Sequence, residues 1–145
     1  MRKTEIIKLV DDGQERIFRI TQMPATKAER WANRAAFILI EATKGRKANK
    51  DIKIEDVLRT IAAVDYDKVE PLYNELIECC EYLPDMNSAG ILCTQQTIDA
   101  QIVEPINLYR LRLAAAKLNF SFFTNVLQFQ ARNQSTITFS KNTQQ

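Results

Sequence analysis

Hydrophobic and polar positions follow a helical period along residues 24–45. Phe37 and Ile40 point away from the main apolar face of this stretch, so the run AAFILI is apolar on nearly every side. A helix of this kind is usually buried on two sides, and the second side is covered either by another part of the same chain or by a partner protein. The main apolar face recurs at spacings of three and four and consists of Ala28, Trp31, Ala32, Ala35, Ile38, Leu39 and Ala42.

Both ends of this helix are marked in the sequence. Thr26 is followed three residues later by Glu29, which is the spacing of a capping box at a helix N-terminus. Gly45 stands where a helix commonly closes in a left-handed conformation. The pattern therefore predicts a helix between Pro24 and Gly45, with the single Trp of the chain packed in the core.

The N-terminal residues alternate instead with a period of two. Residues 4–10 and 16–20 are rich in β-branched residues and are separated by a turn that contains Asp12-Gly13. This predicts a β-hairpin. Because a lone hairpin is marginal in water, it must rest on the helical body through residues such as Phe18 and Ile20.

Two shorter helices are predicted in the middle of the chain. Residues 54–64 carry one helical stripe, after the basic connection 46–53. A third helix is expected with Asp65 or Asp67 as its cap, and it requires Pro71 in its first turn, where the missing amide costs little. Its apolar face consists of Val69, Leu72, Tyr73, Leu76, Cys80 and Leu83.

The stretch that follows is less regular. Residues 84–90, PDMNSAG, predict a loop. Residues 91–103 are left open between a short strand, a helix and an extended lid.

A last major helix is expected to start at Pro105 and to run to Phe123. It carries two apolar stripes about 100° apart. Such a wide apolar face is either central core or half core and half docking surface. One stripe is Leu108, Leu111, Ala115, Leu118 and Phe122, and the other is Ile106, Tyr109, Leu113, Ala116, Phe120 and Phe123.

These elements predict an α+β fold, a mainly α-helical single domain with an N-terminal β-hairpin. The domain is expected to span residues 1–131, with the hairpin at 3–22 and the helical body at 24–131. Residues 132–145 are polar and lack the apolar content to fold alone, which predicts a flexible tail.

Composition removes most enzymatic chemistry. The chain has no histidine and only three glycines, which excludes His-based nucleophile pairs and a phosphate-cradling loop. No catalytic residue, cofactor or metal is therefore expected. Asp65, Asp67 and Glu70 lack the pattern of a calcium loop and are interpreted as caps and a solvated face. The cysteines are Cys79, Cys80 and Cys93, an odd number without a C-x-x-C spacing, and are expected to be reduced and buried.

Charge is spread unevenly along the chain. Residues 1–50 carry a net charge of +6, residues 51–100 carry −8 and residues 101–145 carry +4. We expect these segments to neutralise one another within the fold. The alternative is nucleic-acid binding through Arg30, Arg34 and the basic stretch 46–50, which lacks any accompanying motif. No long apolar run or signal-peptide core occurs, so a cytoplasmic protein that does not enter a membrane is expected.

Three segments together resemble a family of tail assembly chaperones from long-tailed phages. They are FRITQMPATKAERW (18–31), VEPLYNELIECC (69–80) and PINLYRLRLAAAKLNFSFF (105–123), in the order that the family has them. The resemblance covers residues 15–123. It implies a non-enzymatic protein that coats the tape measure protein in the host cytoplasm until tail-tube subunits polymerise around it, and that is absent from the mature virion.

The resemblance implies the tape measure protein as the partner and the tail-tube protein as a second one, and it leaves a homo-oligomer open. An apolar helix would be accepted by exposed apolar anchors at helical spacing. The candidate partner-binding residues are Phe37, Ile40, Tyr109, Leu113, Phe120 and Phe123. Two other functions stay open: a small phage or prophage regulator that binds nucleic acid, and a structural component of the virion.

Overall fold

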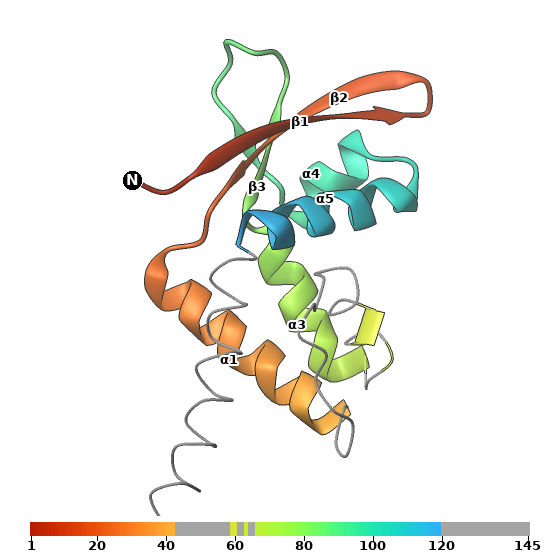
Figure 1. Ribbon diagram of the computed structural model, residues 1–145. Helices are drawn as coiled ribbons and strands as arrows, with labels where there is room; N and C mark the ends of the chain where they lie inside the picture. Colours follow the sequence, from red (N-terminus) through yellow and green to blue (C-terminus); the bar gives the residue numbers. More distant parts are fainter. Residues whose placement is uncertain (43–58, 61–62, 64–65, 120–145) are drawn as a thin grey trace, which may run out of the picture.

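A four-stranded antiparallel sheet forms one end of the computed structural model, and helices fill the remainder (Figure 1). The structure describes residues 1–42, 59, 60, 63 and 66–119. The strands are β1 (Thr4–Asp11), β2 (Gln14–Thr21), β3 (Cys80–Leu83) and β4 (Ile91–Leu92), paired in that order. The helices are α1 (Ala25–Ala42), α3 (Tyr66–Ile77), α4 (Gln95–Gln101) and α5 (Pro105–Leu118). The predicted α+β fold with an N-terminal hairpin is confirmed.

Strands β1 and β2 form the predicted hairpin in one unbroken register, from Thr4 opposite Thr21 to Asp11 opposite Gln14. The two turn residues, Asp12 and Gly13, have φ angles of 49° and 76°. A two-residue hairpin turn of this kind needs positive φ at both positions, which Asp and Gly tolerate better than most residues.

The sheet, α5, α3 and α1 are stacked in that order (Figure 1). Helix α5 packs against β1 and β2 on one side and against α3 on the other, and α3 packs against α1. Phe18 and Ile20 of β2 are fully buried, as the hairpin prediction requires. One continuous core therefore joins the sheet to all three of these helices.

The third helix is shorter than predicted, and this is the main correction to the fold. Helix α3 ends at Ile77, and Cys80–Leu83 form strand β3 alongside β2. Cys80 and Leu83 are buried, but they are buried as strand residues. Their spacing fits a helical face, yet pairing with β2 satisfies the outward-facing backbone groups of β2, which a longer helix would leave unpaired.

Two details of the predicted helix starts are also wrong. Helix α1 begins at Ala25, and the carbonyl of Pro24 accepts the first helical hydrogen bond, from the amide of Ala28 at 2.8 Å. Thr26 is therefore already helical and does not serve as the N-cap. Pro71 lies in the second turn of α3, because that helix begins at Tyr66.

The loop predicted at 84–90 is confirmed, and the stretch left open at 91–103 contains β4 and α4. Thr94 caps α4 by accepting the amide of Thr97. Several predictions lie outside the described residues: the close of the first helix at Gly45, nearly all of the helix at 54–64, and residues 120–145.

Asp11, the last residue of β1, joins the hairpin to the start of α5. Its carboxylate is buried and accepts the backbone amides of Val103 at 2.8 Å and Glu104 at 3.0 Å. The side-chain amide of Asn107 also donates to Asp11 at 2.8 Å and to the carbonyl of Val10 at 3.1 Å. One carboxylate thus satisfies backbone donors at the N-terminus of α5, where a helix has no partners of its own for them.

Burial by itself would raise the pKa of Asp11, but the hydrogen bonds from the amides of Val103 and Glu104 and from Asn107, helped by the charge of Arg16, hold it below its ordinary value. The ionised form is therefore the one that the fold stabilises.

We predict that Asp11→Asn lowers the free energy of unfolding at pH 7 by about 1–3 kcal/mol, because one amide donor then faces an NH₂ group in the core. Urea denaturation measures this loss, and the control is Asp99→Asn, which removes an equal charge from an exposed site. The pKa of Asp11 is lower in the folded protein than in the unfolded protein, where it is about 3.9, so the ionised carboxylate stabilises the fold above that pH. This stabilisation is lost as the pH falls through the pKa of Asp11 in the folded protein. The difference between wild type and Asp11→Asn should therefore shrink below about pH 4. An equal difference at pH 7 and pH 3 would contradict this role.

Candidate partner-binding surface

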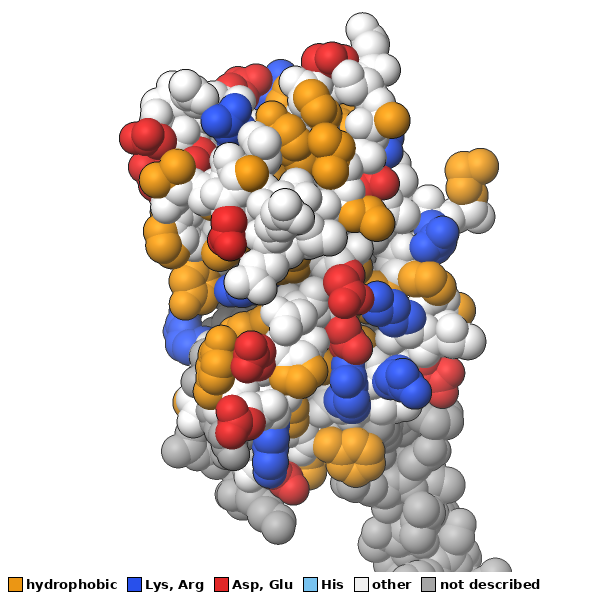
Figure 2. Space-filling model, turned by 180° about the vertical axis from the view of Figure 1, so that it is seen from behind, with side chains coloured by type: hydrophobic (Ala, Val, Ile, Leu, Met, Phe, Trp, Pro, Cys, Tyr) orange, Lys and Arg blue, Asp and Glu red, His pale blue; other side chains and the backbone are white. Residues whose placement is uncertain are grey.

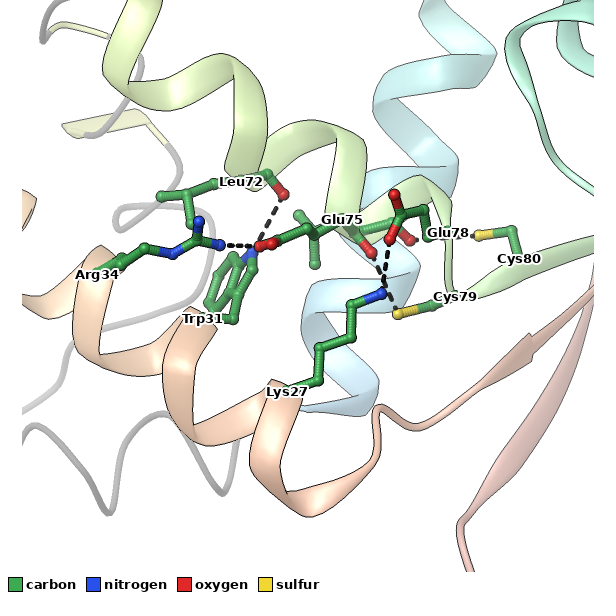
Figure 3. Close-up of polar contacts among 9 residues, drawn as sticks. Lys27, Trp31, Arg34, Leu72, Glu75, Glu78, Cys79 and Cys80 are labelled. Carbon is green, nitrogen blue, oxygen red and sulfur yellow. Dashed lines mark hydrogen bonds and ion pairs between the residues drawn. The ribbon is translucent and has the colours of Figure 1, made fainter.

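Salt bridges connect α1 to α3 and to Glu78, which follows α3 (Figure 3). Arg34 pairs with Glu75, and Lys27 approaches Glu78 at 2.6 Å. At the other end of the helix pair, Lys68 lies 3.8 Å from Glu41. The order of these contacts shows that the two helices run antiparallel.

The face of α1 that packs on α3 contains the predicted core residues. Trp31 is buried, and its indole Nε1 donates to the carbonyl of Leu72 at 3.1 Å (Figure 3). Ala32 and Ala35 are fully buried and allow α3 to approach closely. The interpretation of Trp31 as a packing residue is therefore confirmed.

In the part of the chain that the structure describes, three basic side chains of the N-terminal segment pair with acidic side chains of the middle segment, as expected. Besides the contacts between α1 and α3, Arg19 of β2 donates to Glu81 of β3 at 2.9 and 2.7 Å through Nε and Nη2. Of the residues suggested for nucleic-acid binding, Arg34 is engaged with Glu75, Arg30 is exposed, and 46–50 lie outside the described residues. Figure 2 shows the molecule from behind relative to Figure 1. On this face, acidic and basic side chains lie next to one another over the middle and lower part, without a continuous basic patch.

Phe37 and Ile40 lie on the opposite side of α1 from the core. Phe37 is 65% exposed and Ile40 is 40% exposed, whereas Ile38 and Leu39 between them are buried, as is the preceding Ala36. Since these two side chains are exposed, the described residues do not bury the second side of the helix here. An exposed Phe one turn from an exposed Ile forms a small apolar surface that a partner can cover.

The second apolar stripe of α5 divides into two parts. Ile106 and Tyr109 at its start are exposed, the latter by 59%. Leu113 is half-buried and packs against the core, and Ala116 is buried. Leu113 therefore serves packing more than contact with a partner. Phe120 and Phe123, the two remaining candidates, lie outside the described residues.

A cation–aromatic stack beside Tyr109 was not anticipated from the sequence. The guanidinium of Arg112 lies 5.0 Å from the ring centre of Tyr73 on α3 and 5.7 Å from that of Tyr109. Partial burial raises the pKa of Tyr73, and the charge of Arg112 opposes that rise. The spacing of Tyr109 and Arg112 along the helix is a local signal for such a stack, but the contact with Tyr73 depends on tertiary packing.

The three thiols are buried, as predicted. Burial raises the pKa of Cys79 and of Cys93 to about 11, with nearby Glu side chains adding to the effect, and it raises the pKa of Cys80 further. Cys79 Sγ donates to the carbonyl of Glu75 at 3.5 Å (Figure 3). Thiols in this state are poor nucleophiles, because the thiolate is the reactive form.

Acidic side chains do not gather into a metal site in the part of the chain that the structure describes. Asp67 and Glu70, two of the three residues considered for metal binding, are exposed on α3, and Asp65 lies outside the described residues.

Comparison of the chain with protein-family models, curated proteins and solved structures found no match. Within residues 1–42 and 66–119, no helix combines the length and hydrophobicity needed to cross a membrane. The fold and the surface together define an α+β domain with an exposed apolar pair on its first helix.

We predict that the three thiols do not react with an aromatic disulfide reagent in the native protein and react fully after denaturation. Their burial and their raised pKa values both oppose thiolate formation at pH 8. The release of the coloured thiolate measures the reaction, and a Ser140→Cys variant gives the signal of a thiol introduced in the polar C-terminal stretch. Rapid labelling of one native thiol would show that it is accessible and ionised.

Proposed function

We propose that this protein is a tail assembly chaperone of a long-tailed phage. In this role it is not an enzyme; it binds the tape measure protein and keeps it soluble until tail-tube subunits assemble around it. The observation that carries the proposal is the exposure of Phe37 and Ile40 on a helix whose opposite face is fully packed.

The physical requirement for such a chaperone is a surface that accepts apolar helix faces. A long helical partner exposes apolar residues at i, i+3, i+4 and i+7 until it is assembled. Phe37 and Ile40 have the matching spacing of three and bring an aromatic and an aliphatic side chain to one patch. Arg30 and Glu41 are exposed on the same helix and supply a polar surround of both signs.

The three segments that resemble the chaperone family support the proposal. Residues 18–31 lead from β2 into α1, residues 69–80 form most of α3 and the first residue of β3, and residues 105–118 form α5. Since α3 packs on both α1 and α5, the resemblance falls on the residues that build one helical body.

Co-expression with the phage tape measure protein tests the proposal directly. The expected result is a complex that stays soluble during affinity and size-exclusion chromatography, with the tape measure protein precipitating when this chain is omitted. Mature virions should lack this chain in mass spectrometry, and its presence there would favour a structural role. DNA affinity that falls steeply with salt, in the absence of tape measure binding, would favour the nucleic-acid alternative.

We predict that Phe37→Ser with Ile40→Ser weakens tape measure binding by roughly thirty-fold or more, because two apolar anchors are removed from the buried contact. The free energy of unfolding should change by less than about 0.5 kcal/mol, because both side chains are exposed in the free protein. Pull-down titration measures the binding, and thermal denaturation measures the stability.

The matched control is Met86→Ser with Ile91→Ser, which removes two other exposed apolar side chains from the far end of the sheet. This control should bind like the wild type. A large loss of stability in the Phe37 and Ile40 variant would show that the pair belongs to the core, and equal binding by both variants would place the contact elsewhere.

A further inference from the structure

Strand β1 lies at the end of the sheet, and its second edge has no strand partner in the described part of the chain. The backbone groups that face β2 can be identified from the register. The amide of Gln22 donates to the carbonyl of Lys3 at 2.8 Å, so the hydrogen-bonded pairs of the hairpin involve the odd-numbered residues of β1. The even-numbered residues therefore direct their N–H and C=O groups to the open edge.

One end of this edge is already occupied. The carbonyl of Val10 accepts the side-chain amide of Asn107 at 3.1 Å, which confirms that even-numbered residues face outward and fills the position nearest the turn. Thr4, Ile6 and Lys8 remain, and all three are exposed. The free part of the edge is thus centred on Ile6.

Strand β1 lacks two of the features that keep natural sheet edges from pairing. It contains no proline, and its unbroken register with β2 leaves no bulge. Lys8 is the one basic side chain within it, and that side chain lies 3.9 Å from Glu15 of the same hairpin. The opposite edge of the sheet is much shorter, since β4 has only the two residues Ile91 and Leu92.

We propose that a second copy of this chain pairs antiparallel with β1, on a two-fold axis that passes through Ile6. In this register Ile6 lies opposite Ile6 of the second copy, and Thr4 lies opposite Lys8. Every free N–H and C=O group of Thr4, Ile6 and Lys8 then finds a partner on the other strand. The two sheets join into one, and the two exposed Ile6 side chains cover each other.

Neighbouring registers fit less well. An axis through Lys8 places two ammonium groups directly opposite each other. An axis through Ile7 needs the carbonyl of Val10, which Asn107 already occupies. The contact with Asn107 therefore disfavours the register through Ile7 and limits the length of the pairing toward the turn.

The self-pairing is independent of the proposed chaperone function and uses a different surface. Two short strands bury less area than a standard protein interface, so the dimer should be weak. The fraction of dimer should therefore rise with protein concentration. Sedimentation equilibrium from about 10 μM to about 1 mM is the primary measurement. A protein that stays monomeric over this whole range would overturn the proposal.

Ile6→Lys is expected to weaken dimerisation by at least about ten-fold, because it places two like charges against each other on the axis. Ile91→Lys is the matched control, since it introduces the same charge at the other edge and the two side chains are 45% and 46% exposed. The control should dimerise like the wild type. Dimers that resist Ile6→Lys but fail with Ile91→Lys would show that association uses β4 instead.

A cross-linking experiment tests the register and does not depend on the stability of the lysine variant. Paired residues in a hydrogen-bonded position have Cα atoms about 5.5 Å apart, within the range that a disulfide spans. Ile6→Cys should therefore form a covalent dimer when a copper–phenanthroline oxidant removes two electrons and two protons from the thiol pair. Lys8→Cys should not, because its two copies would lie about 13 Å apart. Equal cross-linking of both variants would refute the register.

Discussion

The buried carboxylate of Asp11 is the constraint on which the arrangement of the layers depends. It lies at the end of β1, yet it satisfies amide donors at the start of α5, nearly a hundred residues later. Because a buried carboxylate without donors is costly, the hairpin and α5 must meet at this point. The position of α5 against the sheet in turn determines where α3 and then α1 can pack.

Charge within the fold is used mainly for pairing between elements. Arg34 of α1 contacts Glu75 of α3, Lys27 contacts Glu78 directly after α3, and Arg19 joins β2 to β3. Such partly exposed pairs contribute little stability each, but they fix which helix faces meet. Among the unpartnered groups of the described residues, two carry the proposals made above: the apolar pair on α1 and the backbone groups along β1. These are the places where we propose contacts with another protein and with a second copy.

Sequence-based predictions were correct where neighbouring residues determine the structure, and they were wrong where contacts between distant residues determine it. The hairpin and α1 were predictable because their alternation, turn and helical period are local. Strand β3 was not, since the spacing of Cys80 and Leu83 also fits a helix and only the neighbouring β2 decides between the two. For the candidate surface, the angular position of Phe37 and Ile40 correctly indicated that they point away from the core. Leu113 is half-buried against the core instead, because α5 has core neighbours on two sides.

The sequence by itself determined the mixed α+β class, the hairpin with its Asp-Gly turn, the core face of α1, and the burial of the thiols. Each of these rests on the character of nearby residues and on the burial of apolar surface, which a pattern records. Tertiary structure decided where α3 gives way to β3, which donors reach Asp11, and which apolar side chains stay exposed. These outcomes depend on hydrogen bonds and packing contacts between groups that are far apart in the chain. The periodicity of the sequence does not show which distant groups will meet.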